Sequence, residues 1–367
     1  MIQSPVLIIG CPRSGTTLLF NILSEVPSLW SIGYESKDII ERYHHPRTLG
    51  WESGALAAAD LTETSRQYML DAFEGGAASG AFWRRLNRFR GRLSGNRLWG
   101  AVKQRGRSRD FGSSVSSAMP QQGLDLIRAY VRARNWAMRR KPIVPRRAPI
   151  RLVEKTPENC LRLPFLLALF PDARVLYLTR DGRSNVHSLI EGWMQPHLFP
   201  GYRVPERLSI PGYTRDRWAF TLIPGWRELT SRPVEEICAW QWIRCNQAVL
   251  AHRSVIARTV VQCEAQRRSE ATKQSHPTEG REGQVPYLTV RYEDLVATPA
   301  MVLPQIAGFL GLDFERDLGH FAQHLPQINV VSEPNREKWR RKNPEAIARV
   351  LPLIEPMMHT LGYDSSS

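Results

Sequence analysis

The 367-residue chain is 42% hydrophobic, and none of its apolar runs approaches the length of about 18 residues that a transmembrane helix needs. Its net charge of +15 is concentrated between Arg84 and Arg151, where 19 basic residues stand against two acidic ones. This charge bears on partners and association rates rather than on fold. The five cysteines are an odd number without a CxxC pair, which argues against a disulfide framework or a zinc site and predicts buried free thiols.

The first predicted element is a strand over Val6 to Gly10, followed by a tight loop and a helix over Thr16 to Leu23. A secretory signal would need a basic stretch and a long apolar stretch before any strand begins. Because strand-like sequence begins five residues into the chain, we expect a cytoplasmic protein.

The rest of the chain alternates between strands and helices. Strands are predicted at 151–155, 173–179 and 287–290, and helices at 161–170, 184–193, 234–253 and 306–310. The stretch 173–179 is apolar almost throughout, as in strands that are buried on both faces of a parallel sheet. We therefore predict a P-loop-like three-layer α/β fold with a central parallel sheet flanked by helices.

The predicted organisation is one domain over residues 1–367. Residues 40–150 are predicted to form a basic, largely helical insertion on the acceptor side. The polar segment 264–284 lacks periodicity and is predicted to be a mobile loop. In parallel βαβ units, ligands bind at the carboxyl ends of the strands, and the two motifs described next both lie there.

The first motif is the loop Gly10-Cys11-Pro12-Arg13-Ser14-Gly15-Thr16-Thr17-Leu18, between a buried strand and a helix. Successive backbone N–H groups and the positive end of the helix make such a loop an anion site. A nucleotide P-loop would have a lysine where Gly15 stands, and a Ser or Thr that holds Mg²⁺. The later strand ends in Thr179-Arg180 rather than in a metal-binding aspartate. A donor held by cations and N–H groups, without a metal, fits this loop better than ATP.

The second motif runs from Arg180 to Ser188 and also follows a strand. The arginine and the serine are eight residues apart across a turn into a helix. A guanidinium fork and a hydroxyl in this arrangement suit a second, separate phosphate.

Together the two motifs resemble the elements that bind 3'-phosphoadenosine 5'-phosphosulfate (PAPS) in sulfotransferases. Further stretches are similar to tyrosylprotein sulfotransferases and related bacterial sulfotransferases. These stretches are 154–157, 170–171, 180–183, 186–188, 291–295, 309–311, 338–339 and 361–363. They cover both ends and the middle of the chain.

The resemblance implies a transfer of a sulfuryl group from PAPS to a hydroxyl or amine acceptor, with 3'-phosphoadenosine 5'-phosphate (PAP) as product and no metal. It places the 5'-phosphosulfate on the first loop and the 3'-phosphate on the second motif. It also places the adenosine beside Tyr292 and Lys338 over the nucleotide, although Tyr292 and Trp339 are equally consistent with core aromatic residues. The implied cofactor-binding residues are Arg13, Ser14, Gly15, Thr16, Thr17, Arg180, Ser188, Tyr292 and Lys338.

In-line transfer at sulfur needs a cation near the leaving oxygen and a base near the acceptor. Arg13 and Lys155 are the candidate cations. Cytosolic small-molecule sulfotransferases have a histidine shortly after this lysine, but here Thr156-Pro157 follows. The tyrosylprotein and carbohydrate relatives use a glutamate after the first helix, which makes Glu35 the candidate base. This assignment depends on position alone, because most glutamates are surface carboxylates.

The basic segment 84–151 has three interpretations. It steers an anionic acceptor such as an acidic peptide, a glycan or a lipid headgroup; it contacts nucleic acid or an anionic membrane; or it is a solvated cap that binds nothing. Of these we expect no nucleic acid, and peripheral membrane contact stays open. His44-His45 makes a poor metal pair because adjacent side chains face apart.

Two other functions compete with the transferase. One is a P-loop kinase-like nucleotide phosphotransferase, which the missing lysine and aspartate disfavour. The other is a non-catalytic binder of anionic polymers through residues 84–151. The sequence identifies neither the acceptor nor the oligomeric state.

Overall fold

The computed structural model describes residues 2–33, 35–76, 150–195, 199, 201–252, 256–260, 285–326 and 338–364. Most of the predicted basic insertion, and all of its arginine-rich part before residue 150, lies outside these residues. The loop predicted at 264–284 lies outside them as well. Both therefore stay predictions.

Five strands form one parallel sheet in the order β2-β1-β3-β5-β4. The strands are β1 (Val6–Ile9), β2 (Val153–Lys155), β3 (Arg174–Thr179), β4 (Ile256–Val260) and β5 (Val285–Arg291). Every residue of β1 is buried, as are all residues of β3 after the first. The central strands are thus covered on both faces, as their apolar sequences predict.

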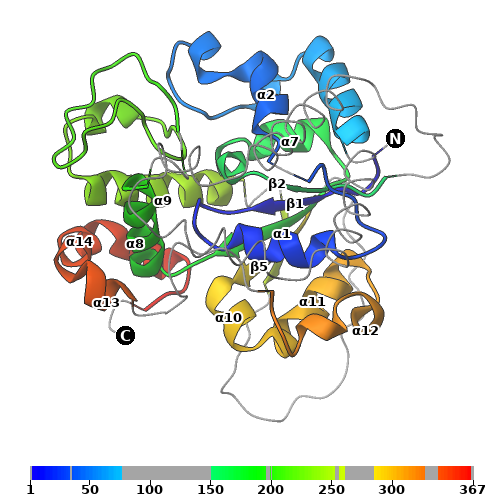
Figure 1. Ribbon diagram of the computed structural model, residues 1–367. Coiled ribbons are helices and arrows are strands. Elements are labelled where there is room, and N and C mark those ends of the chain that lie inside the picture. Colours follow the sequence, from blue (N-terminus) through cyan, green and yellow to red (C-terminus); the bar gives the residue numbers. More distant parts are fainter. Residues whose placement is uncertain are drawn as a thin grey trace, which may run out of the picture.

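The described helices lie on both sides of this sheet (Figure 1). The α-helices include α1 (Thr16–Ser24), α2 (Lys37–His44), α7 (Leu163–Leu169), α8 (Gly182–Trp193), α9 (Val234–Ala251), α10 (Tyr292–Ala297), α11 (Pro299–Leu310), α12 (Phe314–Asp317), α13 (Lys338–Lys342) and α14 (Pro344–Thr360). Residues 63–76 are helical as well. The short 3₁₀ helices are η1 (Pro46–Leu49), η2 (Ala58–Asp60), η3 (Pro157–Leu161), η4 (Trp226–Leu229) and η5 (Gly319–Phe321).

Two hydrophobic cores lie between the sheet and its two layers of helices. One core joins α1, α10 and α11 to the face of the sheet that carries Val6, Ile8 and Leu176. The other joins α2, α7, α8, α9 and α14 to the opposite face, which carries Leu7 and Val175. This alternation along each strand follows from the two-residue period of extended chain. The predicted three-layer fold is confirmed.

The strand order places a switch point between β1 and β3. From β1, the sheet extends to β2 on one side and to β3 on the other. A crevice for ligands forms outside the carboxyl ends of strands at such a point. The loop after Ile9 and the segment after Thr179 are the two chain segments that leave the sheet there.

Some elements differ from the sequence predictions. The helix predicted at 161–170 begins later, at Leu163 of α7, because Arg162 has a φ of −119° and leaves the helical region; Leu161 instead ends η3. Strand β4 and helix α14 were not predicted. Helix α14 continues through Pro352 and Pro356, residues that normally end or kink a helix.

Four cysteines, namely Cys11, Cys160, Cys238 and Cys245, are free and buried, as predicted. Cys263 lies outside the described residues. Among the helices that the structure describes, none has both the length and the apolar character that a membrane span requires.

The central strand supplies a stability test. Replacement of the fully buried Leu176 by alanine is expected to lower the free energy of unfolding by about 2–5 kcal/mol, through lost burial and the cavity left behind. Urea denaturation followed by circular dichroism measures this loss. Met301→Ala is the control, since that side chain is 56% exposed, and its effect should stay within about 0.5 kcal/mol. Equal effects of the two variants would contradict the assigned core.

Candidate functional site

The loop between β1 and α1 is folded tightly around its own backbone. Arg13 and Gly15 both have positive φ, at 71° and 99°. A Cβ added at Gly10 would meet the Leu178 carbonyl oxygen and Ser14 Oγ, each at 2.7 Å. The Ser14 side chain is almost fully buried, and its hydroxyl has no hydrogen-bond partner among the described residues. A buried hydroxyl at a helix N-terminus is suited to an anionic guest.

The second motif forms the start of helix α8. Asp181 caps the helix, and its carboxylate accepts a hydrogen bond from the Ser184 N–H at 3.1 Å. Asn185 then donates from Nδ2 to the Pro12 carbonyl at 2.9 Å. The amide of Asn185 therefore fastens α8 to the first loop, a role that its sequence position did not reveal.

Two further hydrogen bonds bring the predicted phosphate residues together. Arg13 donates from Nε to Ser188 Oγ at 3.2 Å. Arg180 donates from a terminal nitrogen to the Arg13 carbonyl at 2.8 Å. The two motifs, about 170 residues apart in sequence, thus touch at the switch point.

Tyr292 lies against both motifs. A Cβ at Gly15 would lie 2.3 Å from the tyrosine ring, so the ring packs directly on the glycine. The Arg180 guanidinium carbon lies 4.7 Å from the ring centroid. Tyr292 begins α10 directly after β5, at the same edge of the sheet. The structure therefore places this side chain at the candidate site.

Arg13 and Arg180 lie close together at the contact between the two motifs. Burial lowers the pKa of Arg13, and the positive charge of Arg180 lowers it further. The Nε atom of Arg180 is buried and has no hydrogen-bond partner among the described residues. Two like charges held together favour an anion between them, because an anion offsets both the burial and the repulsion.

The two remaining catalytic candidates form an ion pair. Lys155 Nζ donates to Glu35 Oε1 at 2.6 Å. The lysine side chain is 6% exposed and the glutamate side chain is 46% exposed, so the carboxylate stands at the surface end of the pair. Lys155 ends strand β2, and its Nζ lies 5.9 Å from the ring centroid of Phe20 on α1.

Lys338 is bound to helix α8. Its Nζ donates to both carboxylate oxygens of Glu191, at 2.7 and 2.8 Å. Glu191 follows Ser188 by three residues, so both lie on the same side of the helix. The helical spacing could have identified Glu191 in the sequence, but nothing local pointed to Lys338 as its partner.

The side chains of His187, His44 and His45 make structural contacts. His187 Nδ1 lies 3.1 Å from Asn343 Nδ2, and burial lowers its pKa. The His44 ring packs edge-on against Phe165, whereas His45 Nδ1 accepts the Arg47 N–H. Within the described ranges, no cluster of three or more His, Cys, Asp or Glu side chains is arranged to hold a metal ion.

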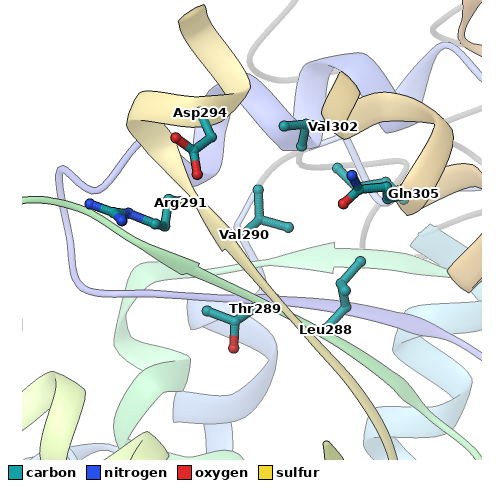
Figure 2. A pocket seen from close by; sticks show the side chains of 8 residues that line it. Leu288, Thr289, Val290, Arg291, Asp294, Val302 and Gln305 are labelled. Atoms are coloured by element: carbon teal, nitrogen blue, oxygen red, sulfur yellow. The ribbon is translucent and has the colours of Figure 1, made fainter. Parts of the chain in front are cut away.

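A separate pocket lies between β5, α10 and α11 (Figure 2). It is lined by Leu288, Thr289, Val290, Arg291, Asp294, Val302, Gln305 and Ile306. Figure 2 shows the Arg291 side chain extending away from Gln305, with aliphatic side chains between them. None of the predicted site residues lines this pocket.

The sequence model of the sulfotransferase family matches residues 5–203, which is more than half of this chain. The chain belongs to the sulfotransferase family. The match includes both phosphate motifs, Glu35 and Lys155, whereas Tyr292 and Lys338 lie beyond it. The resemblance seen in the motifs is confirmed.

The chain is also similar to a named sulfotransferase, at low identity. Protein-tyrosine sulfotransferase A of Caenorhabditis elegans is 23% identical over 235 residues, which cover 60% of this chain and 47% of the relative. This chain thus spans about half the length of that relative.

Solved structures of sulfotransferases also align with the structure of this chain. The sulfotransferase domain from the curacin biosynthetic pathway shares 17% identity at a TM-score of 0.41, over 99% of each chain. Sulfotransferase STF9 of Mycobacterium avium shares 14% identity at a TM-score of 0.42, over 99% of this chain and 78% of the other. The family assignment rests on the sequence match.

The contact between Gly15 and Tyr292 gives a test that needs no ligand. Gly15→Ala should destabilise the protein by more than the cost of about 1–2 kcal/mol for a positive φ, because the new methyl group meets the ring. Tyr292→Ala should relieve that excess. Urea denaturation of both single variants and the double variant measures a coupling energy of about 0.5–3 kcal/mol.

Gly212→Ala is the matched control. Gly212 has a similar φ of 71°, but a Cβ there meets no atom within 4 Å. A Gly15→Ala effect no larger than the Gly212→Ala effect, or additive Gly15 and Tyr292 effects, would refute the contact.

Proposed function

We propose that the protein transfers a sulfuryl group from PAPS to a hydroxyl or amine acceptor. In this reaction the acceptor atom attacks sulfur in line, the bond from sulfur to the phosphate oxygen breaks, and PAP leaves. The observation that carries the proposal is the direct contact of Arg13 with Ser188 and of Arg180 with the Arg13 carbonyl. This contact supports the proposal, because one nucleotide could then reach both motifs.

The donor fits the residues that are present. The loop Arg13 to Thr17 offers the buried Ser14 hydroxyl and a helix N-terminus for the 5'-phosphosulfate. Arg180 and Ser188 offer a guanidinium and a hydroxyl for the 3'-phosphate. Tyr292 offers a ring for the adenosine.

A kinase-like reaction fits the loop less well. The lysine of a nucleotide P-loop would occupy the position of Gly15. Any side chain there would begin 2.3 Å from the ring of Tyr292. Because the loop has no room for this lysine, we favour a donor that arginine and backbone N–H groups bind over a donor that needs the lysine.

We assign the catalytic roles with the help of the ion pair between Lys155 and Glu35. Arg13 and Lys155 stabilise the charge that builds on the leaving phosphate oxygen. Glu35 takes the proton of the acceptor. Lys155 engages Oε1 of the carboxylate, and we assign the proton to Oε2.

The acceptor class is proposed from two sources. The relative from C. elegans is named for sulfation of protein tyrosine, and the reacting group of tyrosine is a hydroxyl. The basic segment 84–151 suits an anionic acceptor such as an acidic peptide, glycan or lipid headgroup. A non-catalytic polymer binder would use the same charges, but it would have no need of the ion pair between Glu35 and Lys155.

Binding of PAP tests the donor. Arg180→Ala should weaken PAP binding about 10- to 150-fold, the usual value of a lost hydrogen bond to a charged group. Isothermal titration calorimetry measures this affinity. Arg203→Ala is the control, because that side chain is 70% exposed and pairs with Asp216. Absence of PAP binding by the native protein, or turnover of Mg-ATP instead, would refute the proposed function.

Removal of the base tests the chemistry. Glu35→Gln keeps the size of the side chain and should lower turnover about 10²- to 10⁴-fold while the affinity for PAP stays the same. A labelled-sulfate screen over peptide, glycan, phenol and lipid acceptors supplies the substrate for the assay. Unchanged turnover in this variant, with the surface variant Glu25→Gln as control, would remove Glu35 from its role.

A further inference from the structure

The segment that carries Glu35 runs alongside the edge of the sheet. Trp30 forms a parallel bridge with Leu152, its N–H donates to the Arg151 carbonyl at 2.9 Å, and its carbonyl accepts the Val153 N–H at 2.6 Å. The turn after Trp30 then reaches the end of β2. The position of Glu35 opposite Lys155 therefore depends on how this turn is placed against the end of β2, where Ser36 has a φ of −78° and a ψ of 7°.

Alternate residues of β2 face opposite layers. Val153 belongs to the core around α1, whereas Leu152 belongs to the core around α7, α8 and α9. By the same alternation, Lys155 lies on the α1 side with Glu35, and Glu154 lies on the other side. Ser36, the residue after Glu35, contacts Glu154.

Glu154 is the centre of a buried hydrogen-bond network. Its Oε1 accepts hydrogen bonds from Ser36 Oγ and Thr156 Oγ1, each at 2.7 Å, and its Oε2 accepts from Asn159 Nδ2 at 2.8 Å. The Ser36 N–H donates to Thr156 Oγ1 at 2.7 Å. All four side chains are at most 1% exposed.

This network fits one placement of the turn against β2, because Ser36 reaches the Glu154 side and Glu35 the Lys155 side. A shift of the turn by one residue would remove Ser36 from Glu154 and bring the Glu35 carboxylate toward the buried carboxylate. Such a shift would leave buried hydroxyl groups without partners and would place two carboxylates together. The Glu35 side chain is 46% exposed, so its own packing supplies little of the restraint.

We propose that Glu154 is a positioning residue, which holds Ser36 and Thr156 and thereby keeps the carboxylate of Glu35 against Lys155 for the transfer. This inference rests on the proposed function. Glu154 does not touch the reacting atoms in this role. It acts through the backbone of the turn.

A glutamine at position 154 should preserve the network. Its carbonyl oxygen can accept the hydrogen bonds from Ser36 and Thr156. Its amide nitrogen would then face Asn159, whose Oδ1 is buried without a partner among the described residues. A flip of the Asn159 amide turns that oxygen toward the new donor. Glu154→Gln is thus the conservative variant, and Glu154→Ala is the disruptive one.

Steady-state kinetics with an acceptor from the sulfate screen test the proposal. Ser36→Ala and Glu154→Ala should lower kcat by about 10- to 100-fold, since small misplacements of catalytic groups have effects of this size. The KM for PAPS and the affinity for PAP should change less than about twofold, because the phosphate motifs lie on other segments. Glu154→Gln should restore most of the kcat that Glu154→Ala loses.

Ser65→Ala is the matched control. Ser65 is also fully buried, and it exchanges hydrogen bonds with Thr62. It should destabilise the protein as Ser36→Ala does, with kcat unchanged. If Glu154→Ala fails to fold, Ser36→Ala and Glu154→Gln decide the matter.

The outcomes separate the two proposals. Native PAP binding together with an unchanged kcat in Ser36→Ala would overturn the positioning role and leave the proposed function intact. An equal loss of kcat in Ser36→Ala and Ser65→Ala would also overturn it. Failure of the native protein to bind PAP would remove the proposed function and this inference with it.

Discussion

The hydrogen bond from Arg13 to Ser188 is the contact on which the candidate site depends. It joins the loop after β1 to the helix after β3, and so brings together the two elements that we propose bind the donor. The strand order makes the contact feasible, because β1 and β3 are neighbours on either side of the switch point. Asn185 on α8 holds the same junction by donating to the Pro12 carbonyl of the loop.

The candidate site holds positive and negative side chains at short distances from one another. Arg13 and Arg180 are held close together, and this proximity adds to the cost of burying Arg13. Lys155 is paired with Glu35, and the buried carboxylate of Glu154 lies on the opposite face of β2, close enough for the lysine charge to act on it. Burial raises the pKa of Glu154, and its hydrogen bonds from Ser36, Thr156 and Asn159 oppose that rise. In the proposed function, Arg13, Arg180 and Lys155 are the cations that meet the anionic donor.

The sequence predicted the parts of the fold that depend on local pattern. Apolar runs predicted the strands at 173–179 and 287–290. The loop from Gly10 to Gly15 predicted the start of the helix at Thr16. Strand β4 was missed because a short segment such as Ile256–Val260 has little pattern of its own. Helix α14 was missed because its prolines argue against a helix that packing maintains. The pairs of Lys155 with Glu35 and of Lys338 with Glu191 span 120 and 147 residues, a separation that no local rule covers.

The central claim is that both motifs bind one nucleotide. A crystal structure of the protein grown with PAP tests it most directly. We predict the 5'-phosphate in the loop Gly10 to Thr17, the 3'-phosphate in contact with Arg180 and Ser188, and the adenosine beside Tyr292. Electron density for PAP at only one of the two motifs, or in the pocket between β5 and α11, would contradict the account.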